Sequence, residues 1–233
     1  MVMKGIEKDN NQYRCERKFI VDQMDSQQVM MMVKLHPAVF IMVYPPRYIN
    51  NIYFDTKDMS YYHENVSGAK ERRKVRLRWY GDMIGEHNKP VMEFKIKDGF
   101  VGTKQHYTLE PLTFRQDVDS DHFQKVIDKS DIPQQVKYYL RDLDPVLVNR
   151  YHRYYFETID RRFRVTVDEG MSYYNLCRFS NSFRYRYLDN RNIVIELKYD
   201  KEIDHIASKI SQSLPFTVTK NSKYVQGIES VYL

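Results

Sequence analysis

The sequence predicts an α+β protein built on an eight-stranded antiparallel β-barrel with helices packed on its outside. About eight stretches alternate polar and apolar residues with the period of a strand. Most links between these stretches are too short for the crossovers that parallel strands need. Aromatic residues are also abundant, with 20 Tyr and 12 Phe against 8 Gly, as expected for half-buried strands. Eight strands can close around an interior that holds side chains or one ligand.

The elements follow in order along the chain. Strands are expected at residues 13–21, 47–55, 73–80, 90–97, 103–110, 148–158, 161–168, 182–188 and 192–199. Pro45-Pro46 opens the second strand, and Asp189-Asn190 forms the turn of a hairpin between the last two. Helices are expected at residues 26–35, 57–65, 201–213 and 221–231, with one or two more over 117–142.

One domain is expected, because no linker, low-complexity segment or change of composition divides the chain. Residues 13–233 form that domain, and residues 1–12 are a flexible N-terminus. Cys15 and Cys177 are too few for a disulfide framework or a zinc site, so we expect free thiols in a reducing compartment. The polar N-terminus and the absence of a long apolar run predict a cytoplasmic protein without a membrane span of its own.

The net charge of +6 and the pI of about 9.1 suit a polyanionic partner. Nucleic acid is not expected, because no zinc, helix-turn-helix or RNP-like signature accompanies the charge. No glycine-rich phosphate loop is present, so a nucleotide is not held in the P-loop manner. The seven histidines are scattered without the spacing of metal ligands.

Charged residues recur on one face of several expected strands. The pattern Glu-x-Lys occurs three times, at Glu16–Lys18, Glu93–Lys95 and Glu196–Lys198, and residues two apart point to the same side of a strand. A basic row runs through Lys74, Arg76 and Arg78, and Arg164 shares a face with Asp168. So many cations cannot lie in a dry core. The charged faces therefore either lie in solvent or line a wet tunnel that holds an anion.

A phosphate chain with a divalent metal would satisfy both signs of charge. Arginine presents a planar fork of donors that suits phosphate oxygens, and carboxylates offer oxygen ligands to a metal. Phosphoryl transfer needs positioning and neutralisation of charge, with little covalent chemistry from the protein.

Eight motifs in order resemble the VTC domain, the catalytic module of the vacuolar transporter chaperone polyphosphate polymerase and its bacterial relatives. They span about residues 13–230 and include Arg14-Cys15-Glu16-Arg17-Lys18-Phe19, Ile52-Tyr53-Phe54-Asp55-Thr56, Lys74-Val75-Arg76-Leu77-Arg78, Glu93-Phe94-Lys95, Tyr151-His152-Arg153, Arg164-Val165-Thr166-Val167-Asp168, Glu196-Leu197-Lys198 and Ser222-Lys223-Tyr224. This family belongs to the triphosphate tunnel metalloenzymes, which are CYTH-like.

The resemblance implies transfer of the ATP γ-phosphate to a growing polyphosphate chain with Mn²⁺ or Mg²⁺. It implies phosphate contacts and catalysis by the basic residues Lys18, Arg76, Arg78, Lys95, Arg153, Arg164, Lys198 and Lys223. Substrate-binding roles are expected for Arg14, Glu16, Tyr53, Lys74 and Glu93. Glu196 would hold the metal.

One departure concerns Arg14, where the hydrolase and cyclase branch carries an acidic residue. A cation there favours binding of a polyanion, which points to the polymerase branch. An inorganic or nucleoside triphosphatase, and a non-catalytic sensor of polyphosphate or inositol phosphates, remain alternatives. The fifth strand leaves open whether Lys104 or His106 faces the tunnel.

Overall fold

The computed structural model describes residues 14–98, 101–177, 183 and 185–233. The expected flexible segment 1–12 lies outside the described residues, and of Arg14 only the backbone is described. The main sheet has nine antiparallel strands, eight of them in one hydrogen-bonded path. The path runs β1 (Arg14–Val21), β11 (Ile193–Asp200), β9 (Phe163–Asn175), β8 (Asp144–Thr158), β2 (Phe40–Asp55), β3 (Glu71–Tyr80), β5 (Val91–Asp98), β6 (Val101–Thr108).

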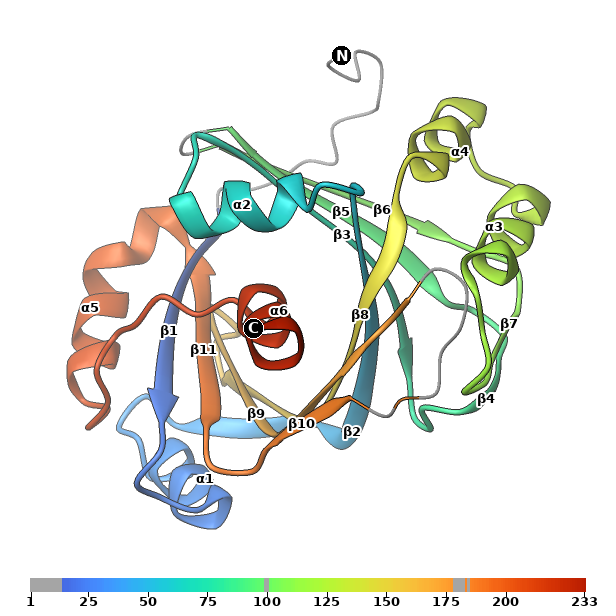
Figure 1. Cartoon of the computed structure of the whole chain (residues 1–233). Helices are drawn as coiled ribbons and strands as arrows, with labels where there is room; N and C mark the ends of the chain where they lie inside the picture. Colours follow the sequence, from blue (N-terminus) through green and yellow to red (C-terminus); the bar gives the residue numbers. More distant parts are fainter. Residues whose placement is uncertain (1–13, 99–100, 178–182, 184) are drawn as a thin grey trace.

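The α+β class and the antiparallel sheet are therefore confirmed, and the strands curl around a common interior (Figure 1). Closure into a barrel is not seen: in the described backbone, β1 and β6 end the path and do not pair with each other. The other side of β1 is met instead by the segment before the last helix, where Thr219 N donates to Lys18 O at 2.8 Å. Side chains also reach across, since Lys95 Nζ on β5 lies 3.6 Å from Glu16 Oε1 on β1.

The expected hairpin around Asp189-Asn190 is wrong. Strand β10 (Arg186–Asp189) pairs with residues 171–174 of β9, and β11 pairs with residues 163–168 of the same strand. The two strands thus follow one another along one edge of β9. The carboxylate of Asp189 explains the link, because it accepts hydrogen bonds from the backbone N–H groups of Arg191 and Asn192 and holds an open bend.

The second strand also differs from expectation. It starts at Phe40, and Pro45-Pro46 lies inside it rather than at its beginning. The pairing of β2 with β8 shifts register between Tyr44 and Arg47, so the prolines form a β-bulge. Proline lacks the N–H group that a regular ladder needs, which is why it occurs at such irregular places.

Five helices pack on the outside of the sheet, as expected (Figure 1). They are α1 (Ser26–Lys34), α2 (Ser60–Ser67), α3 (Ser120–Lys129), α4 (Gln134–Arg141) and α5 (Asp204–Gln212), with a short 3₁₀ turn, η1 (Lys201–Ile203), before α5. Helices α3 and α4 cover one apolar core together with a small sheet of β4 (Gly85–His87) and β7 (Leu112–Phe114). Helices α1 and α5 cover a second core.

The last helix, α6 (Lys223–Tyr232), departs from the expected outside position. Figure 1 shows it in the centre of the ring of strands. Its Tyr224 and Ile228 pack with Leu147, Tyr151 and Tyr173 in a third apolar core, which forms inside the curled sheet. The helix enters because this part of the inner wall is aromatic and aliphatic, unlike the charged part beside it.

None of the described helices is long and apolar enough to cross a membrane. Neither Cys15 nor Cys177 forms a disulfide bond within the described residues.

Candidate functional site

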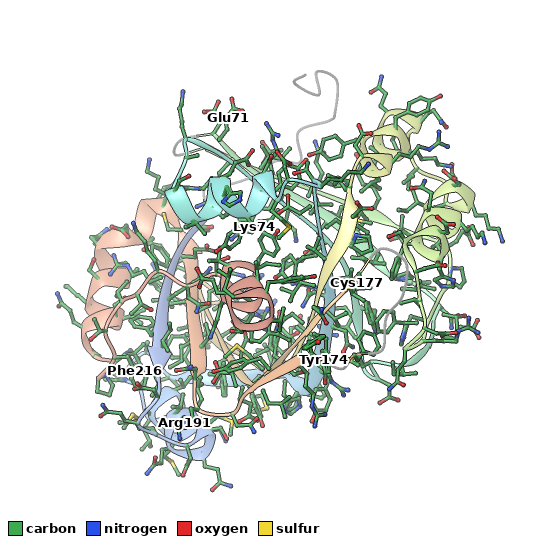
Figure 2. The ribbon with its side chains drawn as sticks, viewed as in Figure 1. Glu71, Lys74, Tyr174, Cys177, Arg191 and Phe216 are labelled. Carbon is green, nitrogen blue, oxygen red and sulfur yellow. The ribbon has the colours of Figure 1, made fainter. Side chains whose placement is uncertain are left out.

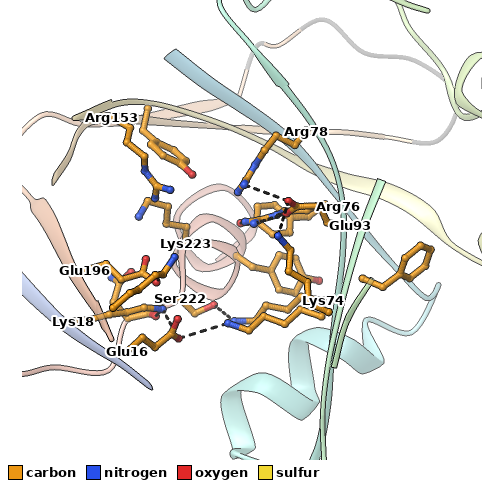
Figure 3. A pocket seen from close by; sticks show the side chains of 18 residues that line it. Glu16, Lys18, Lys74, Arg76, Arg78, Glu93, Arg153, Glu196, Ser222 and Lys223 are labelled. Atoms are coloured by element: carbon orange, nitrogen blue, oxygen red, sulfur yellow. Dashed lines mark hydrogen bonds and ion pairs between the residues drawn. The ribbon is translucent and has the colours of Figure 1, made fainter. Parts of the chain in front are cut away.

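The curled sheet encloses a cavity of about 210 Å³ beside the start of α6 (Figure 3). Among the described residues, nine cationic and three anionic side chains line it. They are Lys18, Lys74, Arg76, Arg78, Lys95, Lys104, Arg153, Lys198 and Lys223, with Glu16, Glu93 and Glu196. The cations exceed the carboxylates by six, so the cavity suits a ligand with several negative charges.

Strand alternation places the basic row. Lys74, Arg76 and Arg78 line the cavity, while the intervening Val75, Leu77 and Trp79 are buried in the core under α3 and α4. Figure 2 shows the same contrast at the level of the whole molecule, with Lys74 inside the ring of strands and Glu71, near the start of the same strand, at the periphery. Burial of the apolar face of β3 in the core therefore places its charged face toward the cavity.

Glu93 is the centre of the first ionic cluster. Its carboxylate lies 2.6 Å from Arg76 Nη2, 3.4 Å from Arg78 Nη1 and 3.2 Å from Lys104 Nζ. Burial opposes ionisation of this side chain, but the three cations outweigh burial and lower the pKa of Glu93 well below its ordinary value. Arg78 is fixed further by its Nε, which donates to Asn51 Oδ1 at 3.0 Å.

Glu16 and Glu196 form the second cluster, on the paired strands β1 and β11. Lys198 Nζ lies 3.1 Å from Glu196 Oε1, and Lys18 Nζ lies 3.4 Å from Glu16 Oε1. The strands are in register so that Glu16 faces Lys198 and Lys18 faces Glu196, which makes the charges alternate. Glu196 is 8% exposed. Burial opposes its ionisation, but Lys198, Lys18 and Arg153 hold its pKa well below the ordinary value.

Asp168 is the centre of the third cluster and lies behind the cavity wall with no exposed surface. Arg153 grips it with two nitrogens, at 2.5 Å and 2.7 Å, and Lys223 Nζ lies 2.7 Å from Oδ2. Both cations also lie over the ring of Tyr151. This cluster ties α6 to β8 and β9, so the position of Lys223 depends on the helix being inside the ring.

Lys74 differs from the other cations of the cavity. Its Nζ donates to Ser222 Oγ at 2.8 Å, and no carboxylate of the described chain lies within ion-pair distance of it. Burial and the neighbouring Lys18, Lys95 and Arg76 lower the pKa of Lys74 to about 7. A large fraction of these side chains is therefore neutral near pH 7 in the absence of a ligand.

Tyrosines form part of the remaining wall. Tyr53 stacks on Tyr224 with ring centroids 5.0 Å apart, and Tyr53 OH accepts a long hydrogen bond of 3.5 Å from Arg76. Tyr224 OH donates to the buried Asp55, which also accepts from the backbone N–H groups of Tyr61 and Tyr62 at the start of α2. Asp55 thus links α2 and α6 and fixes the ring that Tyr53 contacts.

Twelve of the fourteen expected site residues line the cavity, and Arg164 does not. Arg164 is on the sheet face that bears Lys198, its partner in the β9–β11 register, but its Nε pairs with Glu157 at 2.8 Å beyond the cavity. The side chain of Arg14, on which the prediction of the polymerase branch is based, lies outside the described residues.

The register of β6 is now settled. Lys104 faces Lys95 and His106 faces Glu93, which places both on the inner face of the sheet, and Lys104 lines the cavity. The cavity is also lined by Tyr151, Asn221, Ser222 and Tyr224, for which the sequence predicts no separate role. Tyr151 belongs to the motif Tyr151-His152-Arg153, and Ser222 and Tyr224 flank Lys223 in the last motif, so the resemblance to the VTC domain already pointed to these positions. Asn221 contributes a backbone oxygen to Lys18 at 3.2 Å, which no side-chain pattern reveals.

The described residues contain no group of three or more His, Cys, Asp or Glu side chains arranged to hold a metal ion. Glu196 and Glu16 do stand on neighbouring strands of the same wall. Mg²⁺ is commonly bound through one or two carboxylates together with substrate phosphates and water. The donor set therefore fits a metal that arrives with a phosphate ligand, and does not fit a cage made of protein groups alone.

Three solved structures resemble the chain over nearly their whole length. A candidate adenylate cyclase from Vibrio parahaemolyticus has a TM-score of 0.53 at 11% identity, covering 92% of this chain and 97% of the other. A candidate adenylyl cyclase from Hippeastrum, described as having a dominant triphosphatase activity, has a TM-score of 0.52 at 11% identity, with coverages of 94% and 98%. A protein from Pyrococcus horikoshii has a TM-score of 0.50 at 12% identity, with coverages of 91% and 96%.

At these identities the likeness defines the fold, that of the CYTH-like tunnel proteins. Comparison with curated protein sequences gives no match. The VTC domain model matches residues 13–232, nearly the entire chain, and the protein therefore belongs to the VTC domain family.

Proposed function

We propose that this protein is a polyphosphate polymerase, which transfers the γ-phosphate of ATP to a growing polyphosphate chain. The observation that carries the proposal is the cavity with nine cations and three carboxylates in a chain of the VTC domain family. A linear phosphate chain carries charge along its whole length, and the cations come from every side of the cavity rather than from one patch.

The proposed step balances without an acid or a base. A terminal oxygen of the acceptor chain bonds to the γ-phosphorus, and the bond from that phosphorus to the β–γ bridging oxygen breaks. ADP leaves, and the chain is one phosphate longer. Arg76, Arg78 and Lys104 would neutralise charge on one wall, and Arg153, Lys198 and Lys223 on the other.

A divalent metal, Mn²⁺ or Mg²⁺, would be held by Glu196 and the phosphate oxygens, with Glu16 nearby. When bound, such an ion neutralises phosphate charge and polarises the phosphoryl group. Lys18 and Lys198 keep Glu196 ionised before a metal arrives, since both lower its pKa.

The test is to incubate the pure protein with ATP and Mn²⁺ and to look for ADP and for a ladder of long chains on a gel. Glu196→Gln and Lys95→Ala should each lower the rate by about 100-fold or more while the fold is retained. Glu202→Gln and Lys89→Ala, at exposed positions outside the cavity, are the matched controls and should keep the rate. Absence of both products across several primers and metals would refute the polymerase.

A triphosphatase is the second candidate, favoured by the fold shared with the Hippeastrum protein and its described activity. It predicts release of inorganic phosphate from tripolyphosphate without chain growth.

A non-catalytic sensor of polyphosphate or inositol phosphates is the third candidate. It is favoured by the cavity glutamates, which are all already paired with cations. It predicts binding that salt weakens steeply, with no turnover.

A further inference from the structure

Arg47 is the strand partner of the cavity residue Arg153 and stands between two tyrosine rings. Its guanidinium carbon lies 4.1 Å from the ring centre of Tyr80 and 5.0 Å from that of Tyr155. Its Nε donates to Tyr155 OH at 3.1 Å. A guanidinium held over aromatic rings loses less conformational freedom when it binds a ligand than a free side chain does. We call this group the arginine clamp: Arg47, Tyr80 and Tyr155.

The strand register places the clamp on the inner face of the sheet. Arg47 is the partner of Arg153 across β2 and β8, and Arg153 lines the cavity. Tyr80 continues the alternating row of Arg76 and Arg78 on β3. The clamp is therefore a continuation of the cavity wall, although its own residues lie outside the cavity lining.

The proline bulge explains why an arginine can stand at this point. Arg47 lies three positions after Tyr44 on β2, while their partners Tyr155 and Arg153 are only two positions apart on β8. The extra residue is taken up at Pro45-Pro46. Bulges bend a strand and redirect side chains, and they are frequent at barrel rims and next to active sites.

The charge of Arg47 is available for a ligand. Two nitrogens of Arg153, its neighbour in the cavity wall, bind Asp168, and two nitrogens of Arg76 bind Glu93. Arg47 is exposed, and no carboxylate of the described chain lies within ion-pair distance of it. Its two terminal nitrogens thus present the planar fork that binds phosphate oxygens.

We propose that Arg47 is a phosphate subsite outside the cavity, which holds a linear polyphosphate chain where it extends beyond the lining. This proposal rests on the proposed function, since it adds one phosphate-binding residue to those that line the cavity. Because the clamp residues lie outside the cavity lining, we expect a triphosphate held among the lining residues to leave them untouched, whereas a longer chain extends beyond the lining. Arg47 is thus a determinant of preference for long chains.

The test compares binding of inorganic tripolyphosphate with binding of size-fractionated long-chain polyphosphate, by calorimetry at fixed salt concentration. Arg47→Gln should weaken binding of the long chain about three- to tenfold and leave tripolyphosphate unchanged. Arg47→Lys keeps the charge but loses the fork, so it should fall between the wild type and Arg47→Gln. The matched control is Arg150→Gln. Arg150 also lies over a tyrosine ring, that of Tyr48 at 4.0 Å, but next to Tyr151 and hence on the outer face.

The outcomes are separable. If the wild type binds neither ligand, the proposed function fails. If the wild type binds both and Arg47→Gln binds both equally well, only the subsite is refuted. Equal weakening of both ligands by Arg47→Gln, or an effect of Arg150→Gln as large, would also overturn the subsite, because Arg47 would then act through general charge or through the fold. Thermal unfolding of each variant checks that the fold is kept.

Discussion

Glu93 illustrates, at the scale of single residues, how the cavity tolerates its cations without a ligand. Three cations surround its side chain, which is only 9% exposed. Removing one partner of a buried ion pair costs more than the pair contributes, because the remaining charges stay buried without compensation.

We therefore expect Glu93→Gln to lower the free energy of unfolding by about 3 kcal/mol. Saturating tripolyphosphate should restore part of the loss, since phosphate can replace the missing carboxylate among Arg76, Arg78 and Lys104. Chemical denaturation with and without the ligand measures both effects. A variant as stable as the wild type without ligand would contradict this account of the cluster.

Lys74 gives a prediction about pH. Its pKa of about 7 means that the ammonium form is largely present below that pH and largely lost above it. An anion in the cavity favours the charged form, so binding above pH 7 must draw a proton onto Lys74. We expect affinity for tripolyphosphate to fall as pH rises from about 6 to about 8, with proton uptake on binding.

The measurement is calorimetry in buffers of different ionisation enthalpy. Lys74→Arg is the informative variant, since arginine stays protonated throughout this range. It should lose this part of the pH dependence while the titration of the ligand itself remains. Proton uptake of the same size in Lys74→Arg would show that another group is responsible.

At the scale of elements, Gly227 determines how α6 fits inside the ring. A Cβ atom there would lie 2.5 Å from Leu147 Cδ2 and 2.6 Å from Tyr173 Cδ1, closer than real contacts allow. Alanine is favoured over glycine within helices by about 1 kcal/mol, so propensity and packing oppose each other at this position.

We expect packing to dominate, and Gly227→Ala to destabilise the protein by about 1–3 kcal/mol. The shift of α6 should also displace Ser222 and Lys223 and weaken binding of tripolyphosphate. Ser230→Ala on the same helix is the control, because it removes a hydroxyl whose hydrogen bond, within the described residues, goes to Gln226 O in the preceding turn. Thermal unfolding and calorimetry report the two effects. A Gly227→Ala variant more stable than the wild type would mean that Leu147 and Tyr173 move aside to accommodate the methyl group.

Local patterns were enough to predict those elements whose faces differ in polarity. The period of two in Lys74, Arg76 and Arg78 against Val75, Leu77 and Trp79 gives both the strand and its inner face. The position of α6 and the pairing of β10 could not be predicted in this way. Each depends on contacts between distant residues, such as Ile228 with Leu147 or Leu188 with Ser172. The same holds for Asp168, whose partners only the folded chain brings together.

At the scale of the whole molecule, a cavity lined by more cations than carboxylates stores electrostatic repulsion when it holds no ligand. A polyanion relieves it and binds only the folded state. At a tripolyphosphate concentration about 100 times the Kd, linkage gives about 2.7 kcal/mol of stabilisation. For a chain of this length we expect Tm to rise by about 5–10 °C.

Thermal unfolding at low and high ionic strength measures this increase. It should shrink as salt rises, because salt screens the attraction between the anion and the cavity. Chloride or acetate at equal ionic strength controls for general salt effects. An increase that is independent of salt would contradict an electrostatic site.

The pairing of β1 with β11 has a consequence for folding. The cavity needs Lys18 from the beginning of the chain together with Lys198 and Lys223 from near its end, and Lys18 reaches Asn221 across 203 positions of sequence. Contacts this distant form slowly, and synthesis delivers the first strand well before its partner. Until β11 is made, β1 lacks its neighbouring strand and Glu196, and until α6 is made the cavity lacks Lys223. The ability to bind an anion should therefore appear late, so that a bound phosphate ligand indicates that this domain has assembled.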